Sequence, residues 1–581
     1  WGRTCVYEGS PLKKKEPPLK IDETVGDLVE IRDAGRIAVE GVGLVVGLDG
    51  TGSDPELSWQ RTKLINDMRK AKVPHPDKLL ASPDKTMSMV LVKAIIPTGI
   101  NTKDRFDVEV ELTPGSTTKS LKGGHLLLTE LRVMETIKGE MHEGPVLAKA
   151  YGPVLIGNAT NPEDPKVGRV LGGARVKKEI PFTMVIHDRR KSFKTSGMLQ
   201  AIVNTRFTEH QGGENVGMAT AKTDEYLVLR VPTVYHQNPR RYFQVVKLLP
   251  VVDNTELRRV RLQQWGQELL NPKTAGLAAL RLEGIGPNAV ETLKVGLASP
   301  DPSVRFFAAE ALAYLGDANG AEVLGQTAAE RPEFRAYALA ALAALDQPAS
   351  LLHLRKLMAH PDKEVRYGAF NALRTLDPTD PYLGRVRVLR EEEPEEEDED
   401  NFATQIATRR EPRREDPFTL YVVDCDGPPM IHVSRQNRCE IVLFGKGQQL
   451  LTPAVLGGAG SLLINAADGD TQAEISRIGL GKYTGTDQKV SCPLVLAEVI
   501  REAANLGATY PEVLNLLEAA HKQANLSSPL VVDSVPVPND QYDRAQLNLP
   551  EPKKDEGVQK AKYESRLRRG LLDRFRRRSS R

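Results

Sequence analysis

Polar and hydrophobic residues alternate over much of the first 250 residues. The clearest runs lie at 87–97, 105–112, 125–133, 181–188 and 225–232. They are bounded by Gly, Pro or Asp, a pattern typical of strands that bury one face. Helical spacing appears over 58–72 and 192–207. The pattern predicts an α+β region, which we divide into subdomains at 21–157 and 158–252.

The pattern changes after Val252, where Ala and Leu dominate and the strand-like runs stop. A unit of roughly 30 residues recurs between 253 and 380, within the range expected of internal repeats. Each copy has a proline near its start and an apolar residue followed by arginine. These pairs are Val304–Arg305, Phe334–Arg335 and Val365–Arg366. The units resemble short HEAT-like repeats, so this stretch is predicted to be an all-α solenoid whose helical pairs bury their faces on one another.

Charge marks the next boundaries. The run "REEEPEEEDEDN" is followed by basic residues, and we interpret 381–416 as a disordered linker because like charges repel one another. A second α+β domain is predicted over 417–545, with a helical pair at 493–523. Residues 546–581 form a basic tail, and residues 1–20, rich in charge and proline, are predicted to be flexible.

Composition limits the class of protein. The chain has 581 residues, a formal net charge of +2 and four cysteines. It has no apolar run near the roughly 20 residues that a membrane-spanning helix needs. Residues 1–20 contain no apolar signal-peptide core, so a signal peptide is either lacking or already removed. Cys425 and Cys439 flank a loop-like segment; one disulfide between them and buried free thiols both remain open.

The segment "GVGLVVGLDGTGSD" (41–54) looks like a ligand loop but lacks the required parts. Its first three glycines are spaced one residue too widely for a dinucleotide fingerprint, and no Lys-Ser/Thr pair follows the last glycine. Oxygen-bearing side chains at Asp49, Thr51 and Ser53 lack the later glutamate of a calcium loop. We therefore interpret the glycines as permitting a bend, close backbone approach and a tight turn.

The chain offers few candidates for catalysis. Ser116 and Lys119 match the S-x-x-K of penicillin-recognising serine enzymes, but Ser116 follows Pro114-Gly115, which favours a turn over the start of a helix. The ten histidines are scattered, and cysteine and histidine are not spaced as in a zinc site. We therefore expect no catalytic, cofactor-binding or metal-binding residues.

Four segments that contain glycines at their turns resemble a known protein family. These are 41–54, 119–131, 146–157 and 165–184, and they resemble successive motifs of the bacterial flagellar P-ring protein family in that family's order. The strand at 220–232 looks like the one that follows. Residues 496–526 are similar to the family's closing helical pair. The inserted helical repeats, the acidic linker and the basic tail depart from the family pattern.

The resemblance implies a structural role. P-ring proteins form a many-subunit ring in the periplasm, around the flagellar rod and beside peptidoglycan, without catalysis. A homo-oligomeric ring needs head-to-tail contacts whose rotation closes. We expect the following residues to shape turns that serve either subunit contacts or folding alone: Gly43, Gly47, Gly50, Gly52, Ser120, Leu121, Gly123 and Gly124.

The resemblance also sets expectations for partners. The solenoid is expected to bind another envelope protein, and the alternative to a ring subunit is an envelope adaptor that acts through its repeats without a flagellar role. The basic tail with its interleaved leucines suits an anionic surface, so membrane contact stays open, whereas no nucleic-acid partner is expected. A serine–lysine envelope enzyme is a third and more distant alternative.

Overall fold

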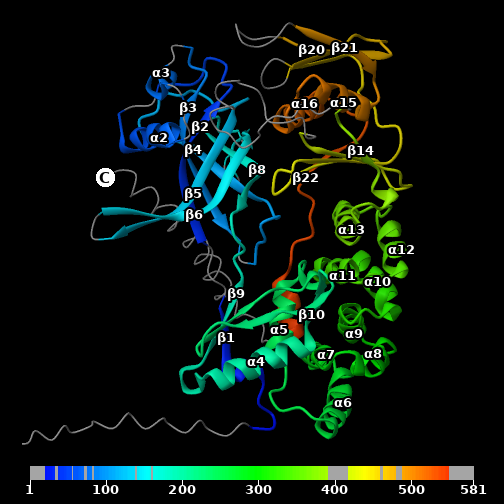
Figure 1. The fold of residues 1–581 in the computed structure, drawn as a ribbon. Coiled ribbons are helices and arrows are strands. Elements are labelled where there is room, and N and C mark those ends of the chain that lie inside the picture. The colour runs from blue at the N-terminus through cyan, green and yellow to red at the C-terminus, as the bar shows by residue number, and fades with distance from the viewer. Residues whose placement is uncertain are drawn as a thin grey trace, which may run out of the picture. The chain divides into compact units, whose positions relative to one another are not determined.

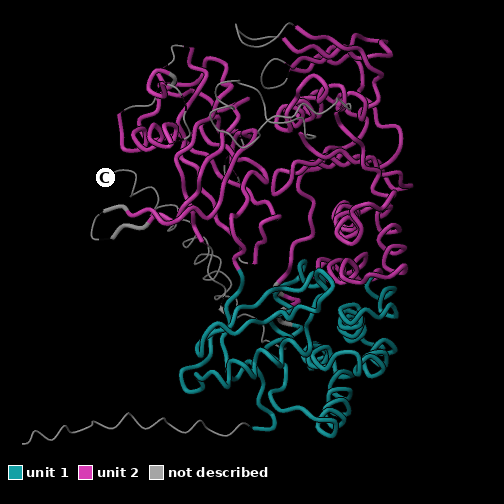
Figure 2. Tube along the Cα trace, in the orientation of Figure 1, with its two compact units in different colours: residues 1–34, 181–324, 545–548 teal, residues 35–180, 325–544, 549–581 magenta. Residues whose placement is uncertain are grey.

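The computed structural model describes residues 20–32, 37–54, 57–70, 73, 75–81, 84–97, 99–137, 140–158, 161, 163–389, 417–457, 462–478 and 487–547. The chain divides into two compact units (Figure 2). The first comprises residues 1–34, 181–324 and 545–548, and the second comprises 35–180, 325–544 and 549–581. The expected flexible segment and basic tail lie almost entirely outside the described residues, as do residues 390–416 of the expected linker. Residues 381–389 of that linker are ordered instead, because Leu383 and Val388 are buried and β14 (Arg385–Val386) pairs in a sheet.

The second unit begins with a closed antiparallel sheet. Its strands are β2 (Ile37–Val46), β3 (Ser88–Ile96), β4 (Phe106–Leu112), β5 (His125–Ile137), β6 (Glu140–Pro153), β7 (Leu155–Ile156) and β8 (Val167–Val176). The order is β4-β3-β2-β5-β6-β8-β7, and β4 also pairs with β8. This last pairing closes the sheet and leaves β4 with partners on both sides. The predicted strands at 87–97, 105–112 and 125–133 are therefore confirmed.

Nearly continuous apolar residues, as in β3, give this sheet two apolar faces. Val90, Val92, Val108 and Val110 belong to the core that the sheet encloses. The other face is covered by helices α2 (Trp59–Lys70) and α3 (Pro76–Leu80), and its core includes Leu44 and Met68. Because β8 completes this sheet, the division expected near residue 158 lies instead near residue 180.

The first unit contains a smaller sheet packed with helices. Its strands are β1 (Val29–Arg32), β9 (Phe182–Ile186), β12 (Ala219–Ala221) and β13 (Tyr226–Leu229), in the order β1-β9-β13-β12. A separate hairpin joins β10 (Thr208–Gln211) and β11 (Glu214–Gly217). The helices are α1 (Val25–Leu28), α4 (Phe193–Arg206) and α5 (Pro239–Leu248). Ser192 begins α4 by accepting a hydrogen bond from the Thr195 N–H.

A run of helices follows, where the sequence predicts the solenoid (Figure 1). The helices are α6 (Thr255–Leu269), α7 (Ala275–Ile285), α8 (Val290–Leu297), α9 (Pro302–Tyr314), α10 (Ala321–Glu330), α11 (Pro332–Ala344), α12 (Pro348–Leu357) and α13 (Lys363–Leu376). We call them the helical stretch. The repeated prolines at 302 and 332 occupy first-turn positions, where a missing N–H costs nothing. The division between the two units falls within α10.

Two further sheets complete the second unit. One orders β14 (Arg385–Val386), β15 (Thr419–Val423), β17 (Glu440–Phe444), β16 (Met430–Val433) and β22 (Leu530–Val532). The other orders β18 (Ala454–Gly457), β19 (Leu462–Ala466), β20 (Gln472–Arg477) and β21 (Gln488–Pro493). The fold is thus α+β, with strand-rich parts on both sides of a helical stretch, as predicted.

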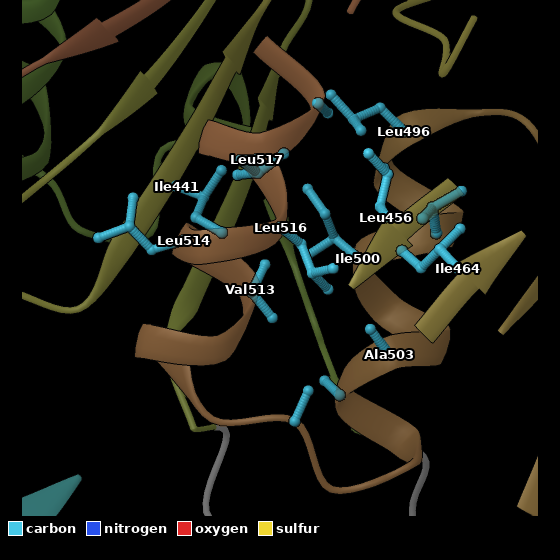
Figure 3. Packing of buried hydrophobic residues seen from close by; sticks show 14 of the residues in the cluster. Ile441, Leu456, Ile464, Leu496, Ile500, Ala503, Val513, Leu514, Leu516 and Leu517 are labelled. Carbon is cyan, nitrogen blue, oxygen red and sulfur yellow. The ribbon is translucent and has the colours of Figure 1, made fainter. Parts of the chain in front are cut away.

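The predicted helical pair is present as α15 (Leu496–Asn505) and α16 (Tyr510–Lys522). Gly507 takes φ +83° in the turn between them, and Thr509 and Glu512 form a capping box at the start of α16. Ile500 and Leu516 pack in one apolar cluster with Leu456 and Ile464 of the neighbouring sheet (Figure 3). After β22 the chain ends its described part in a short helix, α17 (Asp540–Leu547).

Candidate functional site

Three of the predicted turn glycines have a backbone conformation that favours glycine. The φ angles of Gly47, Gly50 and Gly123 are +77°, +62° and +75°. A Cβ atom at Gly50 or Gly123 would have nothing within 4 Å, so space does not restrict these two positions. Their requirement for glycine therefore lies in the left-handed backbone alone.

Three others are glycine because another part of the chain approaches closely. A Cβ at Gly43 would lie 2.6 Å from Oγ1 of Thr129, on the adjacent strand β5. A Cβ at Gly52 would lie 2.7 Å from the carbonyl oxygen of Lys85, and one at Gly124 would lie 2.9 Å from Cδ2 of Leu48. These three glycines maintain packing within one chain.

The structure brings the two glycine segments together. The Thr51 hydroxyl donates to the carbonyl oxygen of Ser120 at 2.8 Å, and the Lys119 N–H donates to the carbonyl of Thr51 at 2.8 Å. Leu121 is fully buried, and its N–H donates to the carbonyl of Pro165. Residues 41–54 and 119–124 thus form one turn cluster at the end of the closed sheet.

Beside this turn cluster lies a group of hydroxyls. Thr118 Oγ1 lies 2.8 Å from Ser53 Oγ and 2.7 Å from Ser88 Oγ. Ser116 Oγ lies 3.2 Å from Ser53 Oγ and 3.1 Å from Thr118 Oγ1. The hydroxyl of Ser116 is therefore engaged by other hydroxyls, which satisfies buried polar atoms and gives no sign of activation by Lys119.

The repeated arginines all perform the same local task. Each side chain donates to a backbone carbonyl oxygen in the last turn of the preceding helix or in the loop just after that helix. The pairs are Arg305 with Ser299 at 2.9 Å, Arg335 with Ala328 at 3.0 Å, and Arg366 with His360 at 3.0 Å. Carbonyls at a helix end lack partners within the helix, so the arginine satisfies them. The preceding residues Val304, Phe334 and Val365 are buried.

A buried ionic cluster in the first unit was not predicted from the sequence. The Arg241 side chain of α5 is 1% exposed, and the carboxylates of Glu283 on α7 and Glu310 on α9 are completely buried. Arg241 Nη2 lies 2.5 Å from Glu283 Oε2, and Arg241 Nη1 lies 2.6 Å from Glu310 Oε2. One guanidinium thus joins two helices of the helical stretch to α5.

Aromatic hydroxyls and stacking complete this cluster. The Tyr235 hydroxyl donates to Glu283 Oε1 at 2.7 Å, and Arg241 lies over the Tyr314 ring, 5.0 Å from its centroid. Burial, followed by the charge of Glu283, raises the pKa of Tyr235 well above its usual value. A buried charge is tolerated only when it is paired and hydrogen-bonded, so this cluster depends on all its members. The sequence did not predict this cluster, because Arg241, Glu283 and Glu310 lie too far apart in the chain to form a recognisable motif.

A second buried cluster ties α13 to the sheet of β15–β17. The Glu440 carboxylate forms hydrogen bonds with Arg374 and with the Tyr367 hydroxyl, and both glutamate and arginine are nearly inaccessible. The Tyr367 ring stacks on His432, with ring centroids 3.5 Å apart. His432 Nε2 accepts a hydrogen bond from the Ser534 N–H at 3.1 Å. Burial, with Arg374 as the second cause, lowers the pKa of His432 to about 3.

The candidate disulfide is not formed. Cys425 and Cys439 are both free thiols, as is Cys492. Cys439 contacts the carbonyl oxygen of Leu171 in β8 at 3.8 Å, so its sulfur points toward the closed sheet. Burial raises the pKa of the Cys439 thiol to about 12, which keeps it protonated and unreactive at neutral pH.

Neither a metal-ligand cluster nor a membrane-spanning helix occurs among the residues that the structure describes. Within them, no three His, Cys, Asp or Glu side chains gather as metal ligands do. Among the helices of the described ranges, none is both long and apolar enough to cross a membrane. The candidates that remain are therefore the turn cluster and the two buried ionic clusters.

The regions that are similar to known proteins include the turn cluster and part of the buried ionic cluster around Arg241. The family profile described as "Flagellar P-ring protein" matches residues 24–265. The recognition from the four glycine-rich motifs is confirmed over this range. Residues 24–265 are similar to the flagellar P-ring protein family. We call them the P-ring-like region.

Individual relatives agree with the profile. "Flagellar P-ring protein 1" of Yersinia pestis is 29% identical over 222 residues, covering 36% of this chain and 56% of the relative. "Flagellar P-ring protein" of Aquifex aeolicus (strain VF5) is 30% identical, covering 37% and 56%. That of Fervidobacterium nodosum is 29% identical over 268 residues, covering 44% and 71%. The chain thus spans little more than half the length of the first two relatives.

The limits of the match divide the buried ionic cluster. Arg241 lies in the P-ring-like region, whereas Glu283 and Glu310 lie beyond residue 265. The turn cluster lies entirely inside the matched range. Helices α7 and α9 are therefore joined to the P-ring-like region by a shared core, in addition to the covalent chain.

Proposed function

We propose that this protein is a structural subunit of a homo-oligomeric ring in the bacterial periplasm, similar to the flagellar basal-body P ring around the rod. The observation that carries this proposal is the match of residues 24–265 to the flagellar P-ring protein family. Rings of this kind place identical copies head to tail, so each copy needs two different contact surfaces. The first proposed partner is another copy of the same protein. The flagellar rod, peptidoglycan or other envelope proteins are the further proposed partners.

The geometry of the turn cluster refines which glycines serve subunit contacts. Gly43, Gly52 and Gly124 are packed against atoms of the same chain, so we assign them to folding. Gly50 and Gly123 are exposed and have open space around them. We assign these two to contacts with a neighbouring copy, because an exposed turn offers backbone groups to another chain.

The HEAT-like character of the helical stretch remains part of the proposal. The repeated arginines and prolines support it, since each performs the same task in successive units. The inner helices α9, α11 and α13 are almost wholly buried, whereas Val295 of α8 and Leu352 of α12 are exposed. We therefore assign an envelope partner to α12. An adaptor role without a ring is the alternative.

Electron microscopy of the purified full-length protein tests the proposal. Closed rings of uniform diameter are expected, with sedimentation showing a large assembly. Conversion of Gly123 to Asn keeps the left-handed turn and adds a side chain where a neighbour would sit, so it is expected to impair ring formation without unfolding the subunit. A protein that stays monomeric under all native conditions, and yields no rings from the cell envelope, contradicts the ring and favours the adaptor.

A further inference from the structure

The exposed surface of α12 continues onto the segment that follows α13. Helix α12 packs beside α13 (Figure 1), and after α13 the chain forms a short helical turn, η5 (Pro381–Leu383), and then β14. Arg355 of α12 joins these parts. Its Nη2 lies 2.6 Å from Oδ2 of Asp380, and its guanidinium lies over the Tyr382 ring, 4.3 Å from the centroid. Residues of α12, η5 and β14 therefore form one surface, which we call the α12 surface.

Two apolar side chains are open to solvent on the α12 surface. Leu352 is 65% exposed and Tyr382 is 52% exposed. Leu352 precedes Arg355 by three residues and Lys356 by four, a spacing that places these side chains on one face of the helix. Because Arg355 also covers the Tyr382 ring, its side chain links the two apolar residues. Exposed aromatic and arginine side chains are typical of the residues that dominate protein interfaces.

Basic side chains flank this apolar pair. Lys356 of α12, Arg385 of β14 and Arg387 just beyond β14 are exposed. Arg385 pairs across the sheet with Tyr421, whose ring packs edge-on against Phe370 of α13 at 4.9 Å. Cross-strand partners share one face of a sheet, so Arg385 lies on the face that α13 covers. The basic residues of β14 and the helix pair of α12 and α13 are therefore on the same side of this sheet.

Nearby carboxylates do not neutralise Lys356 and Arg385. Asp380 is 3% exposed and is paired with Arg355. The Asp377 carboxylate accepts hydrogen bonds from the N–H and the hydroxyl of Thr379. Among the residues that the structure describes, neither Lys356 nor Arg385 has a carboxylate within ion-pair distance. A basic surface beside exposed apolar side chains is complementary to an acidic partner that also carries apolar side chains.

The acidic run of this chain matches the α12 surface only in part. Residues 391–400 follow closely after β14 in the sequence, but they consist of glutamate, aspartate and one proline. Such a run supplies negative charge but no leucine or aromatic side chain to cover Leu352 and Tyr382. The occupant that fits both features is an acidic segment of another protein that also carries leucine or an aromatic residue.

We propose that the α12 surface binds an acidic peptide segment of an envelope protein. Apolar side chains of the segment lie on Leu352 and Tyr382, and its carboxylates lie at Lys356 and Arg385. This inference rests on the proposed function, which assigns an envelope partner to α12. Electrostatic attraction of this kind speeds the encounter and weakens as salt is added. The apolar contact then selects among acidic partners, because charge alone does not distinguish them.

The first experiment uses the full-length protein and a fluorescent peptide of glutamate and aspartate that carries one leucine and one phenylalanine. Fluorescence anisotropy is expected to show binding that weakens as sodium chloride is added. The double variant Lys356→Glu and Arg385→Glu is expected to bind about tenfold more weakly than wild type. Arg259→Glu with Lys273→Glu reverses two exposed charges at α6 and the turn after it, and this matched control is expected to bind as wild type does. No binding by wild type, or an equal loss in both double variants, overturns the proposal.

The second experiment tests the apolar contact from both sides. Leu352→Ser changes a side chain that is mostly exposed, and it is expected to weaken binding of the same peptide without unfolding the protein. A peptide in which serine replaces leucine and phenylalanine is expected to bind wild type weakly as well. This peptide control needs no variant of the protein. Undiminished binding in both measurements shows attraction by charge alone and overturns the proposal.

Two other occupants are distinguished by further measurements. A chain in which glutamine and asparagine replace the acids of residues 391–400 is expected to bind the peptide as wild type does. Binding that appears only in this chain shows that the acidic run covers the surface, which overturns the proposal. Vesicles of phosphatidylglycerol test an anionic lipid. Vesicle binding that the Lys356→Glu and Arg385→Glu variant loses, with no peptide binding by wild type, also overturns it.

These readouts separate the inference from the proposed ring. Ring formation by each variant is followed by electron microscopy, and circular dichroism compares its fold with that of wild type. Particles without rings refute the ring, whether or not the peptide binds. Rings whose subunits do not bind the peptide refute the acidic-peptide site alone.

Discussion

The closed sheet of β2–β8 and helices α9 and α11 both bring backbones close together, but they use different residues to do so. In the sheet, Gly43 and Gly124 remove side chains where strands and turns approach. In α9 and α11 alanines perform this role, and Ala308, Ala311, Ala338 and Ala341 are all buried. The difference follows from geometry, because glycine weakens a helix by about 1 kcal/mol relative to alanine.

The two regions also differ in their buried polar groups. The turn cluster of the closed sheet contains neutral hydroxyls such as Ser53 and Thr118. The helical stretch buries full charges, since Glu283, Glu310 and Arg374 are nearly inaccessible. A neutral hydrogen bond can be lost at small cost, whereas an unpaired buried charge cannot. The helical stretch is therefore expected to be the region more sensitive to single polar substitutions.

The largest expected effect is that of Arg241→Met. This substitution leaves the carboxylates of Glu283 and Glu310 without their cation in a buried site, and a loss of about 3–5 kcal/mol is expected on that basis. Urea unfolding followed by circular dichroism measures the loss. Arg258→Met removes a partly exposed ion pair with Asp253 and is the control, with an expected loss below about 1 kcal/mol. Equal effects of the two variants contradict the central role of Arg241.

Substitutions at two adjacent glycines test the packing of the closed sheet. In Gly124→Val the added atoms overlap Leu48, so a loss of about 3 kcal/mol is expected from overpacking. Gly123→Asn is its neighbour and control, because Asn tolerates a φ of +75° and has space, so its loss is expected to stay below about 1 kcal/mol. Thermal unfolding of both purified variants provides the measurement, and a larger loss at position 123 contradicts the assignment.

Acid is expected to weaken the contact of α13 with its sheet. The folded pKa of His432, about 3, lies below the ordinary value of 6.5, so the unfolded chain binds the additional proton. Stability from the neutral ring is complete above pH 6.5 and is lost as pH falls toward 3, by up to about 1.4 kcal/mol per pH unit.

The matched variant is His432→Phe, which keeps a ring on Tyr367 but cannot titrate. Its free energy of unfolding is expected to depend less steeply on pH between 6 and 4 than that of wild type. The lost hydrogen bond from Ser534 lowers its stability by an amount that does not vary with pH. Parallel pH profiles for the two chains rule out His432 as a source of the dependence.

The smallest expected effect concerns the hydroxyls. Thr118→Val keeps the shape of the side chain but removes the oxygen that lies 2.8 Å from Ser53 and 2.7 Å from Ser88. A loss of about 1–2 kcal/mol is expected, because these hydroxyls stay buried with fewer partners. Chemical unfolding measures it. A loss as large as that of Arg241→Met removes the distinction between neutral and charged cores.

Much of the fold could be predicted from patterns among residues that are close together in the sequence. Alternation predicts β3, β4 and β5, and the spacing of apolar residues predicts α2 and α4. The prolines and alanines between 253 and 380 predict the helical stretch, and the glycine motifs identify the P-ring-like region. These signals succeed because each depends on residues that are near one another in the chain.

Tertiary structure alone decided the rest. The pairing of β8 with β4 closes the sheet and moves the expected division from residue 158 to about 180. Cys439 faces Leu171 rather than Cys425, although the loop spacing permitted a disulfide. Arg241 meets Glu283 and Glu310, which lie 42 or more residues away, and Tyr542 meets Tyr337. Such contacts depend on how distant helices pack, and no local spacing in the sequence encodes them.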